Sequence, residues 1–141
     1  MRFDVAKTMH PVDQLLETAI ADSHLLYSNR EAGDEYWKPR DLDFVFYSSE
    51  KKQIKTVASF VTDNRYGDPR IEKFKDDDGK TKFWLIVTVN APTTDPIVHS
   101  ISALMCILAG LFGIEYDGWG CVMQRPATPP LSASPPPFPS I

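Results

Sequence analysis

The alternation of apolar and polar positions is clearest in residues 83–120. Residues 83–89 are rich in aromatic and β-branched side chains and predict a strand. Pro96 marks the start of a helix. Proline has no amide proton, and in the first turn of a helix that proton would have no hydrogen-bond partner anyway. Apolar side chains then recur at helical spacing: Ile97, Val98, Ile101, Leu104, Met105, Leu108, Leu111 and Phe112. Residues 83–89, 95–113 and 114–120 are therefore predicted as strand, helix and strand.

Similar patterns predict two helices and a strand in the first half of the chain. In residues 11–27, six apolar positions fall close to one helical stripe: Val12, Leu15, Leu16, Ala19, Ile20 and Leu26. Residues 41–47 alternate as a strand does. Ser48 or Ser49 is expected to cap the next helix, whose apolar positions are Ile54, Val57, Ala58 and Val61. This helix is predicted to stop in residues 64–69, where Gly67 can adopt the left-handed conformation.

Asp78-Gly79 is the strongest short hairpin signal, because both central positions of a two-residue hairpin turn need positive φ. It predicts that residues 71–74 pair antiparallel with residues 83–89. The element order after the N-terminal helix is then βαββαβ. Two right-handed crossovers around one sheet predict an α+β, ferredoxin-like sandwich: a four-stranded antiparallel sheet with two helices on one face, plus the N-terminal helix.

This fold leaves one face of the sheet open. If Leu42, Phe44 and Phe46 meet the helices, then Val45 and Tyr47 point away from them. The next strand adds one of two alternating sets to the open face, either Phe83, Leu85 and Val87 or Trp84, Ile86 and Thr88. A sheet face this apolar is rarely left exposed to solvent, so we expect something to cover it. The N-terminal helix, the C-terminal tail and a partner are the three candidates to cover it.

The helix predicted at residues 95–113 has a second unusual side. Residues 96–114 contain no formally charged residue and nearly reach the length of a membrane-spanning helix, but they include Pro96, two serines and two glycines. We interpret the segment as part of a domain and expect no membrane partner. Small or uncharged residues occupy the side away from the main apolar stripe: His99, Ser102, Ala103, Cys106, Ala109 and Gly110. A solvated helix face normally carries charges, so another element, such as the N-terminal helix, is expected to cover this side.

A length of 141 residues suits one compact domain with a tail. We assign residues 1–32 to the N-terminal helix and its connecting loop, and residues 33–124 to the ferredoxin-like domain. Residues 125–141 are rich in proline and are expected to form an extended, disordered tail. Pro135-Pro136-Pro137 is a candidate ligand for a polyproline-binding groove, with an inert tail as the alternative.

The formal net charge of −4 argues against a general electrostatic grip on nucleic acid, which needs clustered cations. Cys106 and Cys121 make no disulfide framework and are expected to be reduced, buried thiols. The N-terminal residues lack an apolar signal core. These observations predict a cytoplasmic protein.

No catalytic or metal-binding constellation is visible. His10, His24 and His99 lie in separate elements, and none begins a zinc-type spacing. The acidic residues 76–78 resemble a calcium loop only superficially, because the positions that should carry further ligands fall in the apolar strand that follows. We therefore expect no metal, no cofactor and no enzymatic activity.

The most distinctive run is Glu115-Tyr116-Asp117-Gly118-Trp119-Gly120. Glycines on both sides of a tryptophan leave room for its ring and let the backbone bend. One interpretation is that Trp119 fills a gap at the sheet edge. The other is that Trp119 is a rigid anchor on an interaction surface, since tryptophan is common among interface hot spots.

This run, together with residues 38–44 and 89–96, resembles the bacterial regulators of ribonuclease E activity, type B (RraB). The resemblance covers residues 33–123. It implies a ferredoxin-like, cytoplasmic protein that binds ribonuclease E away from its catalytic centre and inhibits RNA cleavage without being an enzyme. On this basis, the candidate protein-interaction residues are Arg40, Tyr116, Asp117, Gly118, Trp119 and Gly120.

Two other functions are compatible with this fold. An RNA-binding module would stack bases on aromatic residues of the open face, with Tyr47 and Trp84 as candidates, although no basic-aromatic signature run is present. A ligand-binding or enzymatic domain is the third possibility, because ferredoxin-like folds carry many activities. It is the least supported, since no titratable groups converge in the sequence.

Overall fold

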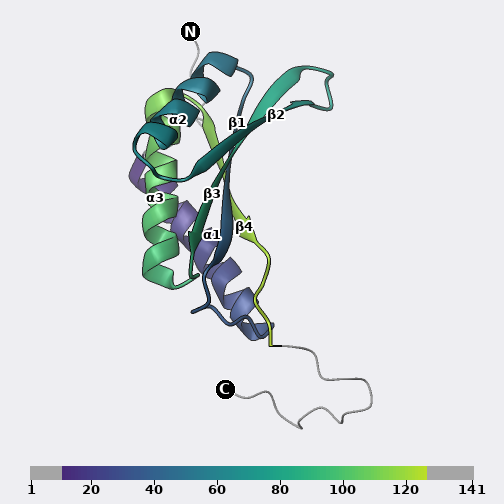
Figure 1. The fold of residues 1–141 in the computed structure, drawn as a ribbon. Coiled ribbons are helices and arrows are strands. Elements are labelled where there is room, and N and C mark those ends of the chain that lie inside the picture. Colours follow the sequence, from purple (N-terminus) through teal and green to yellow (C-terminus); the bar gives the residue numbers. More distant parts are fainter. Residues whose placement is uncertain (1–10, 127–141) are drawn as a thin grey trace.

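The computed structural model describes residues 11–126. Seven elements follow one another along the chain (Figure 1). They are α1 (Pro11–Glu31), β1 (Arg40–Ser48), α2 (Lys51–Asp63), β2 (Asp68–Lys75), β3 (Thr81–Ala91), α3 (Asp95–Phe112) and β4 (Glu115–Cys121). The predictions for residues 1–10 and for the tail from residue 127 onward lie outside the described residues.

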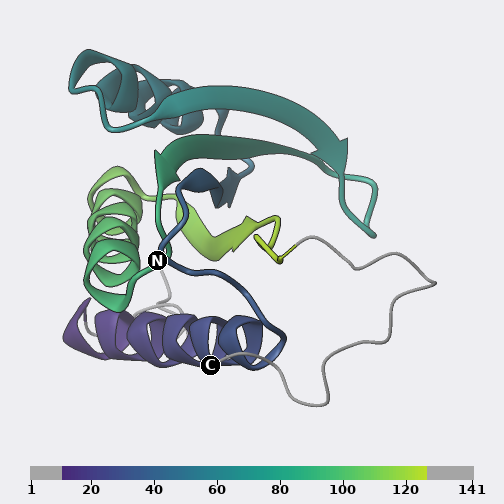
Figure 2. The same ribbon diagram turned by 60° about the horizontal axis from the view of Figure 1, so that its bottom comes forward.

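The four strands form one antiparallel sheet in the order β2-β3-β1-β4. The two central strands are β1 and β3, with Phe44 opposite Val87 and Phe46 opposite Leu85. The helices α2 and α3 lie on the same side of this sheet (Figure 2). This arrangement confirms the predicted α+β, ferredoxin-like sandwich.

The core lies between the sheet and these two helices. Leu42, Phe44 and Phe46 of β1 are fully buried, as the alternation of their strand predicts. They share the core with Leu85 and Val87 of β3 and with buried residues of the helices: Ile54, Val57, Val61, Val98, Met105 and Leu108. Of the two alternatives for β3, the structure therefore selects Phe83, Leu85 and Val87 for the helix side and Trp84, Ile86 and Thr88 for the open face.

The uncharged side of α3 is covered by α1, which also contacts β4 (Figure 2). Ser102, Cys106 and Ala109 are buried there. The expectation that another element covers this side is confirmed, and α1 is that element. As a result α1 does not reach the open face, and no described element covers that face of the sheet.

Several local predictions need correction. The apolar stripe predicted in α1 does not all turn inward, because Val12, Leu16 and Ile20 are about half exposed or more. Leu111, predicted on the core side of α3, is 75% exposed because the sheet and α1 contact other sides of that helix. The N-cap of α2 is Glu50, whose amide donates to Ser48 Oγ (3.0 Å), so neither serine is the cap residue itself.

The two turns next to β2 also differ from expectation. In the β2–β3 hairpin only Gly79 has positive φ (+76°), and Gly79 N donates to Asp76 O. This is the pattern of a longer loop built on a type I turn followed by a left-handed glycine. After α2, Arg65 takes the left-handed conformation (φ 57°). Gly67 is required for space instead, since a Cβ there would lie 2.7 Å from Val87 Cγ1.

Among the described helices, α3 is long and apolar enough to cross a membrane by length and composition. Core helices of soluble domains meet the same criterion. Here α3 packs against the sheet, α1 and α2, and its C-terminus is closed by Gly113 in the left-handed conformation (φ 68°). Part of its apolar surface is therefore buried inside the fold, while Ile107 and Leu111 remain exposed.

Candidate protein-interaction surface

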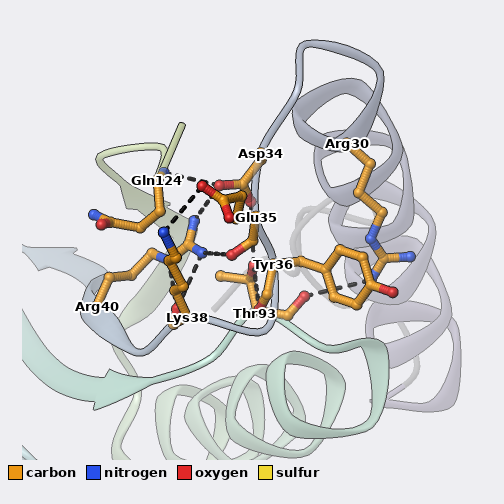
Figure 3. Close-up of polar contacts among 8 residues, drawn as sticks. All are labelled: Arg30, Asp34, Glu35, Tyr36, Lys38, Arg40, Thr93 and Gln124. Carbon is orange, nitrogen blue, oxygen red and sulfur yellow. Dashed lines mark hydrogen bonds and ion pairs between the residues drawn. The ribbon is translucent and has the colours of Figure 1, made fainter. Parts of the chain in front are cut away.

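The first predicted site residue, Arg40, is buried at the start of β1. Its guanidinium forms an ion pair with Asp34 (2.6 Å), and both side chains are almost completely inaccessible. Arg40 Nη2 also donates to the carbonyl oxygens of Glu35 and Lys38 (Figure 3). Arg40 therefore holds the loop between α1 and β1 rather than presenting its charge to a partner.

Asp34 connects this loop to two distant segments. Its Oδ1 accepts a hydrogen bond from the amide of Gln124 (2.8 Å), beyond β4, and its Oδ2 accepts one from the Thr93 hydroxyl (3.4 Å). Glu35 N donates in turn to Gln124 O. The α1–β1 loop, the β3–α3 loop and the end of β4 are thus joined around one buried carboxylate (Figure 3).

The same loop displays two aromatic residues that the sequence analysis did not single out. Tyr36 is 38% exposed and Trp37 is 57% exposed, and their rings meet edge to face at 5.2 Å. The Arg30 guanidinium lies over the Tyr36 ring at 4.5 Å (Figure 3). The sequence feature that could have indicated this site is the pair of aromatic residues inside an otherwise polar loop. Sequence alone did not reveal that the loop is anchored.

Trp119 lies inside the molecule, with only 9% of its surface exposed. Its ring is 6.4 Å from that of Phe44, and its Nε1 donates to Oδ1 of the buried Asp22 in α1 (3.0 Å). Of the two interpretations, the structure supports the one in which Trp119 fills space beneath the sheet edge. Trp119 is not an exposed anchor, because α1 packs directly against it and covers it.

Tyr116 also points toward the helices. Its hydroxyl is 2.9 Å from Ser102 Oγ in α3, and its ring is 5.4 Å from that of Phe46. Burial raises the pKa of the Tyr116 hydroxyl well above its usual range, so it stays protonated and serves as a hydrogen-bonding group.

A β-bulge explains how Tyr116 and Trp119, three positions apart, face the same side. Val45 pairs with Gly118 but its neighbour Phe46 pairs with Tyr116, which leaves Asp117 as the extra residue. Gly118 supplies the positive φ of the bulge (+104°). Asp117 is consequently exposed, and Gly118 and Gly120 lie opposite Val45 and Asp43 on the open face.

The open face carries a group of three aromatic residues, Tyr47, Phe74 and Trp84, which we term the aromatic cluster. Phe74 stacks on Trp84 (ring centroids 4.6 Å apart, interplanar angle 19°), and Tyr47 meets Trp84 edge to face at 5.6 Å. The three residues come from β1, β2 and β3. Next to the cluster, Gly118 and Gly120 leave the second half of β4 without side chains on this face.

Charges around the aromatic cluster are mostly negative. Asp41, Asp43, Glu115 and Asp117 lie along β1 and β4, on or beside the open face. Two cations of β2 and β3 form ion pairs, Arg70 with Glu72 (3.3 Å) and Lys82 with Asp76 (3.5 Å), and Lys82 Nζ also lies 5.8 Å from the centre of the Tyr47 ring. Tyr47 donates to Glu115 (2.7 Å), and this bond raises the pKa of Tyr47 to about 12, so Tyr47 is neutral at physiological pH.

Within residues 11–126, no group of three or more histidine, cysteine or acidic side chains is placed to hold a metal ion. Cys106 and Cys121 are both free thiols. Burial is the main cause that raises the pKa of each thiol, which makes neither a ready nucleophile.

The sequence model of the family described as "Regulator of ribonuclease activity B" (RraB) matches residues 19–121, more than two thirds of the chain. The chain belongs to the RraB family. No curated protein was found to match it. The RraB match contains all four strands, α2, α3 and the greater part of α1.

All six predicted site residues and the aromatic cluster fall inside the RraB match. The structure divides the six by their surroundings. Arg40, Tyr116 and Trp119 join the sheet to the segments packed against it, while Asp117, Gly118 and Gly120 help to form the surface beside the aromatic cluster. Family membership makes the chain one of the regulators of ribonuclease activity, and a role in partner contact remains a prediction for each of the six.

Proposed function

We propose that this protein is a non-enzymatic, cytoplasmic regulator that binds ribonuclease E, or a related nuclease, and lowers its cleavage of RNA. Membership in the RraB family supports a regulatory role. A regulator of this kind needs a surface that recognises a protein rather than a site that performs chemistry.

We assign partner contact to the open face of the sheet, with the aromatic cluster at its centre and Asp117, Gly118 and Gly120 at its margin. The observation that carries this assignment is that no described element covers a face formed by Tyr47, Phe74 and Trp84. Aromatic rings are enriched in protein interfaces because they bury a large area with little loss of side-chain freedom. The carboxylates along β1 and β4 favour a partner segment that carries lysine or arginine beside apolar side chains.

Arg40 and Trp119 have an indirect role in this proposal. Arg40 fixes the loop that leads into β1, and Trp119 fixes β4 against α1 through Asp22. Both strands contribute to the open face, so these two residues position the surface without touching the partner.

The test combines capture and cleavage. Purified chain is mixed with purified ribonuclease E, and binding and cleavage of a model RNA are measured with wild type and with Trp84→Ala. Trp84→Ala is expected to weaken binding about tenfold or more, as loss of a hot-spot residue does. Lys52→Ala, an exposed change on α2 away from the open face, is the matched control and should leave binding unchanged. If wild type neither binds nor inhibits at micromolar concentration, ribonuclease E is not the target.

RNA binding by the open face is the second candidate, favoured by the partly exposed aromatic rings on a ferredoxin-like sheet. It ranks below protein binding for two reasons. Phe74 already occupies one face of the Trp84 ring, and the cations Arg70 and Lys82 are paired with carboxylates. A salt-dependent shift of labelled RNA that disappears in Trp84→Ala would place RNA binding first, whereas flat titrations would remove it.

A further inference from the structure

A groove runs between α1 and α3 on the helical side of the molecule. It has a volume of about 530 Å³, and its apolar lining residues are Leu15, Ala19, Ile20 and Ala103. Its polar lining residues are Thr18, Asp22, Ser23, His24 and His99, and Ser23 Oγ is 3.4 Å from His99 Nε2. The groove lies on the side of the sheet opposite the aromatic cluster, so it is a separate surface.

Both helices that form the groove also carry exposed apolar side chains, and one of these, Ile20, lines the groove itself. On α1, Val12, Leu16 and Ile20 are 62%, 58% and 49% exposed, and they recur every four residues. On α3, Ile107 and Leu111 are 48% and 75% exposed. Burying such side chains in a complex is favourable by roughly 25 cal/mol per Å² of apolar area removed from water.

The helices that carry these exposed apolar side chains, α1 and α3, run antiparallel beside each other. Three contacts between them establish the direction: Thr18 with Cys106, Ser23 with His99, and Arg30 with Asp95. A groove between two antiparallel helices that also carry exposed apolar side chains has the shape that accepts the apolar face of a third helix, whose anchors recur at i, i+4 and i+7.

The charges of α1 and α3 define which helix would fit. The two helices carry five carboxylates, Asp13, Glu17, Asp22, Glu31 and Asp95. Their single formal cation is Arg30, which lies at one end and pairs with Asp95 (2.6 Å). Asp22 is buried and Asp95 is paired, so the exposed negative charge of α1 comes from Asp13, Glu17 and Glu31. A second copy would bring the same negative charges against the groove, which is unfavourable.

We propose that this groove is a docking site for an amphipathic helix of a partner protein, with an apolar stripe flanked by lysine or arginine. The apolar stripe lies on Leu16, Ile20, Ala103 and Ile107, and the flanking cations face the carboxylates of α1. The proposal goes beyond the proposed function, because it concerns a different face and does not require the nuclease to be the partner.

The test uses two labelled peptides of about 18 residues, long enough to form several helical turns. Both have the same leucine stripe, and one carries lysine where the other carries glutamate. Titrated into the full chain, the lysine peptide is expected to bind at least about tenfold more tightly than the glutamate peptide and to lose affinity as salt rises.

Two variants and a control locate the binding. Ile20→Ser with Ile107→Ser removes apolar area at half-exposed positions, where folding should tolerate it, and is expected to weaken the lysine peptide about tenfold. Asp13→Lys with Glu17→Lys is expected to reduce or reverse the preference for lysine. Trp84→Ala, on the open face, should leave the peptide affinity within about twofold of wild type.

Three results would overturn the proposal. The first is equal binding, or no binding, of the two peptides. The second is a dimer of the wild-type chain in sedimentation that disappears in the Ile20→Ser/Ile107→Ser variant, because the groove would then hold a second copy. The third is a gain in peptide affinity of about tenfold on deletion of residues 2–10, because the chain's own N-terminal segment would then be the occupant. None of these results depends on whether Trp84→Ala affects nuclease binding.

Discussion

The two faces of the four-stranded sheet use the same strands in different ways. On the helix side, Phe44 and Phe46 are fully buried beneath α2 and α3. On the open side, Tyr47 and Trp84 are only partly buried and contact other residues of the face. Aromatic residues occur on both faces, so hydrophobicity alone does not distinguish a core from a recognition surface. The distinction depends on which face the helices cover.

The largest effect is expected on the covered face. Phe44→Ala removes a fully buried ring and leaves a cavity between the sheet and the helices, which should lower the free energy of unfolding by about 4 kcal/mol. Urea denaturation measures this change. A loss no larger than that of Trp84→Ala would contradict the difference between the faces.

Arg40 should be the next most sensitive position. Arg40→Met leaves the charge of Asp34 buried without its partner and is expected to destabilise the fold by about 3 kcal/mol. The double variant Arg40→Met/Asp34→Asn removes that charge as well and should recover part of the loss. Urea unfolding of both variants measures these stability changes. A double variant less stable than Arg40→Met would show that burial of the unpaired Asp34 charge is not the cause of the loss.

Asp22 supports the covered face through Trp119. Asp22→Ala leaves Trp119 Nε1 without its acceptor and should cost about 2 kcal/mol of stability. Asp22→Asn keeps an oxygen for this bond and is the matched control. Thermal or urea unfolding should therefore rank wild type and Asp22→Asn close together, with Asp22→Ala well below them.

The same pair gives a pH dependence. Burial raises the pKa of the Asp22 carboxyl above its ordinary value of 3.8, and the hydrogen bonds from Ser102 and Trp119 and the charge of His99 oppose this only in part. A carboxyl with a raised pKa in the folded state contributes stability fully below pH 3.8 and loses it as pH rises through the folded value. The stability of Asp22→Asn should therefore increase relative to that of wild type as pH rises through this window. If wild type instead became more stable relative to Asp22→Asn as pH rises, the ionised form of Asp22 would be the one favoured in the folded state.

Trp84 tests the open face directly. Because its ring is only partly buried, Trp84→Ala should cost about 1 kcal/mol of stability, the scale of its aromatic contacts, while it weakens nuclease binding about tenfold. Unfolding and binding measured on the same preparation separate the two effects. A large stability loss with unchanged binding would assign Trp84 to the core.

The smallest stability effect is expected at Gly120. A Cβ there meets no atom within 4 Å and its φ is not positive, so Gly120→Thr should change stability by less than about 1 kcal/mol and place a side chain on the open face. Gly118→Thr is the comparison, because its φ of +104° strains any side chain. Reduced nuclease binding by Gly120→Thr at unchanged stability would support the proposed surface, and unchanged binding would exclude that margin.

Local patterns predicted most of the fold correctly. The order of strands and helices, the hairpin position and the alternation in β1 follow from side-chain periodicity and turn residues, which act over a few positions. The candidate site was less predictable. Residue types pointed to residues 115–120 as unusual, but one extra residue in a bulge turned Tyr116 and Trp119 to the same side, and strict alternation cannot show that.

The sequence by itself determined the ferredoxin-like order, the two faces of the central strands and an uncharged side of α3 that needed a cover. Only the tertiary structure decided that α1 supplies this cover, that Arg40 and Trp119 are buried beside Asp34 and Asp22, and that the open face stays uncovered by the described elements. The physical reason is the distance along the chain between the residues that make contact. Periodicity and turns record contacts between near neighbours, whereas Asp22 and Trp119 are 97 positions apart and meet only when helices and sheet pack together.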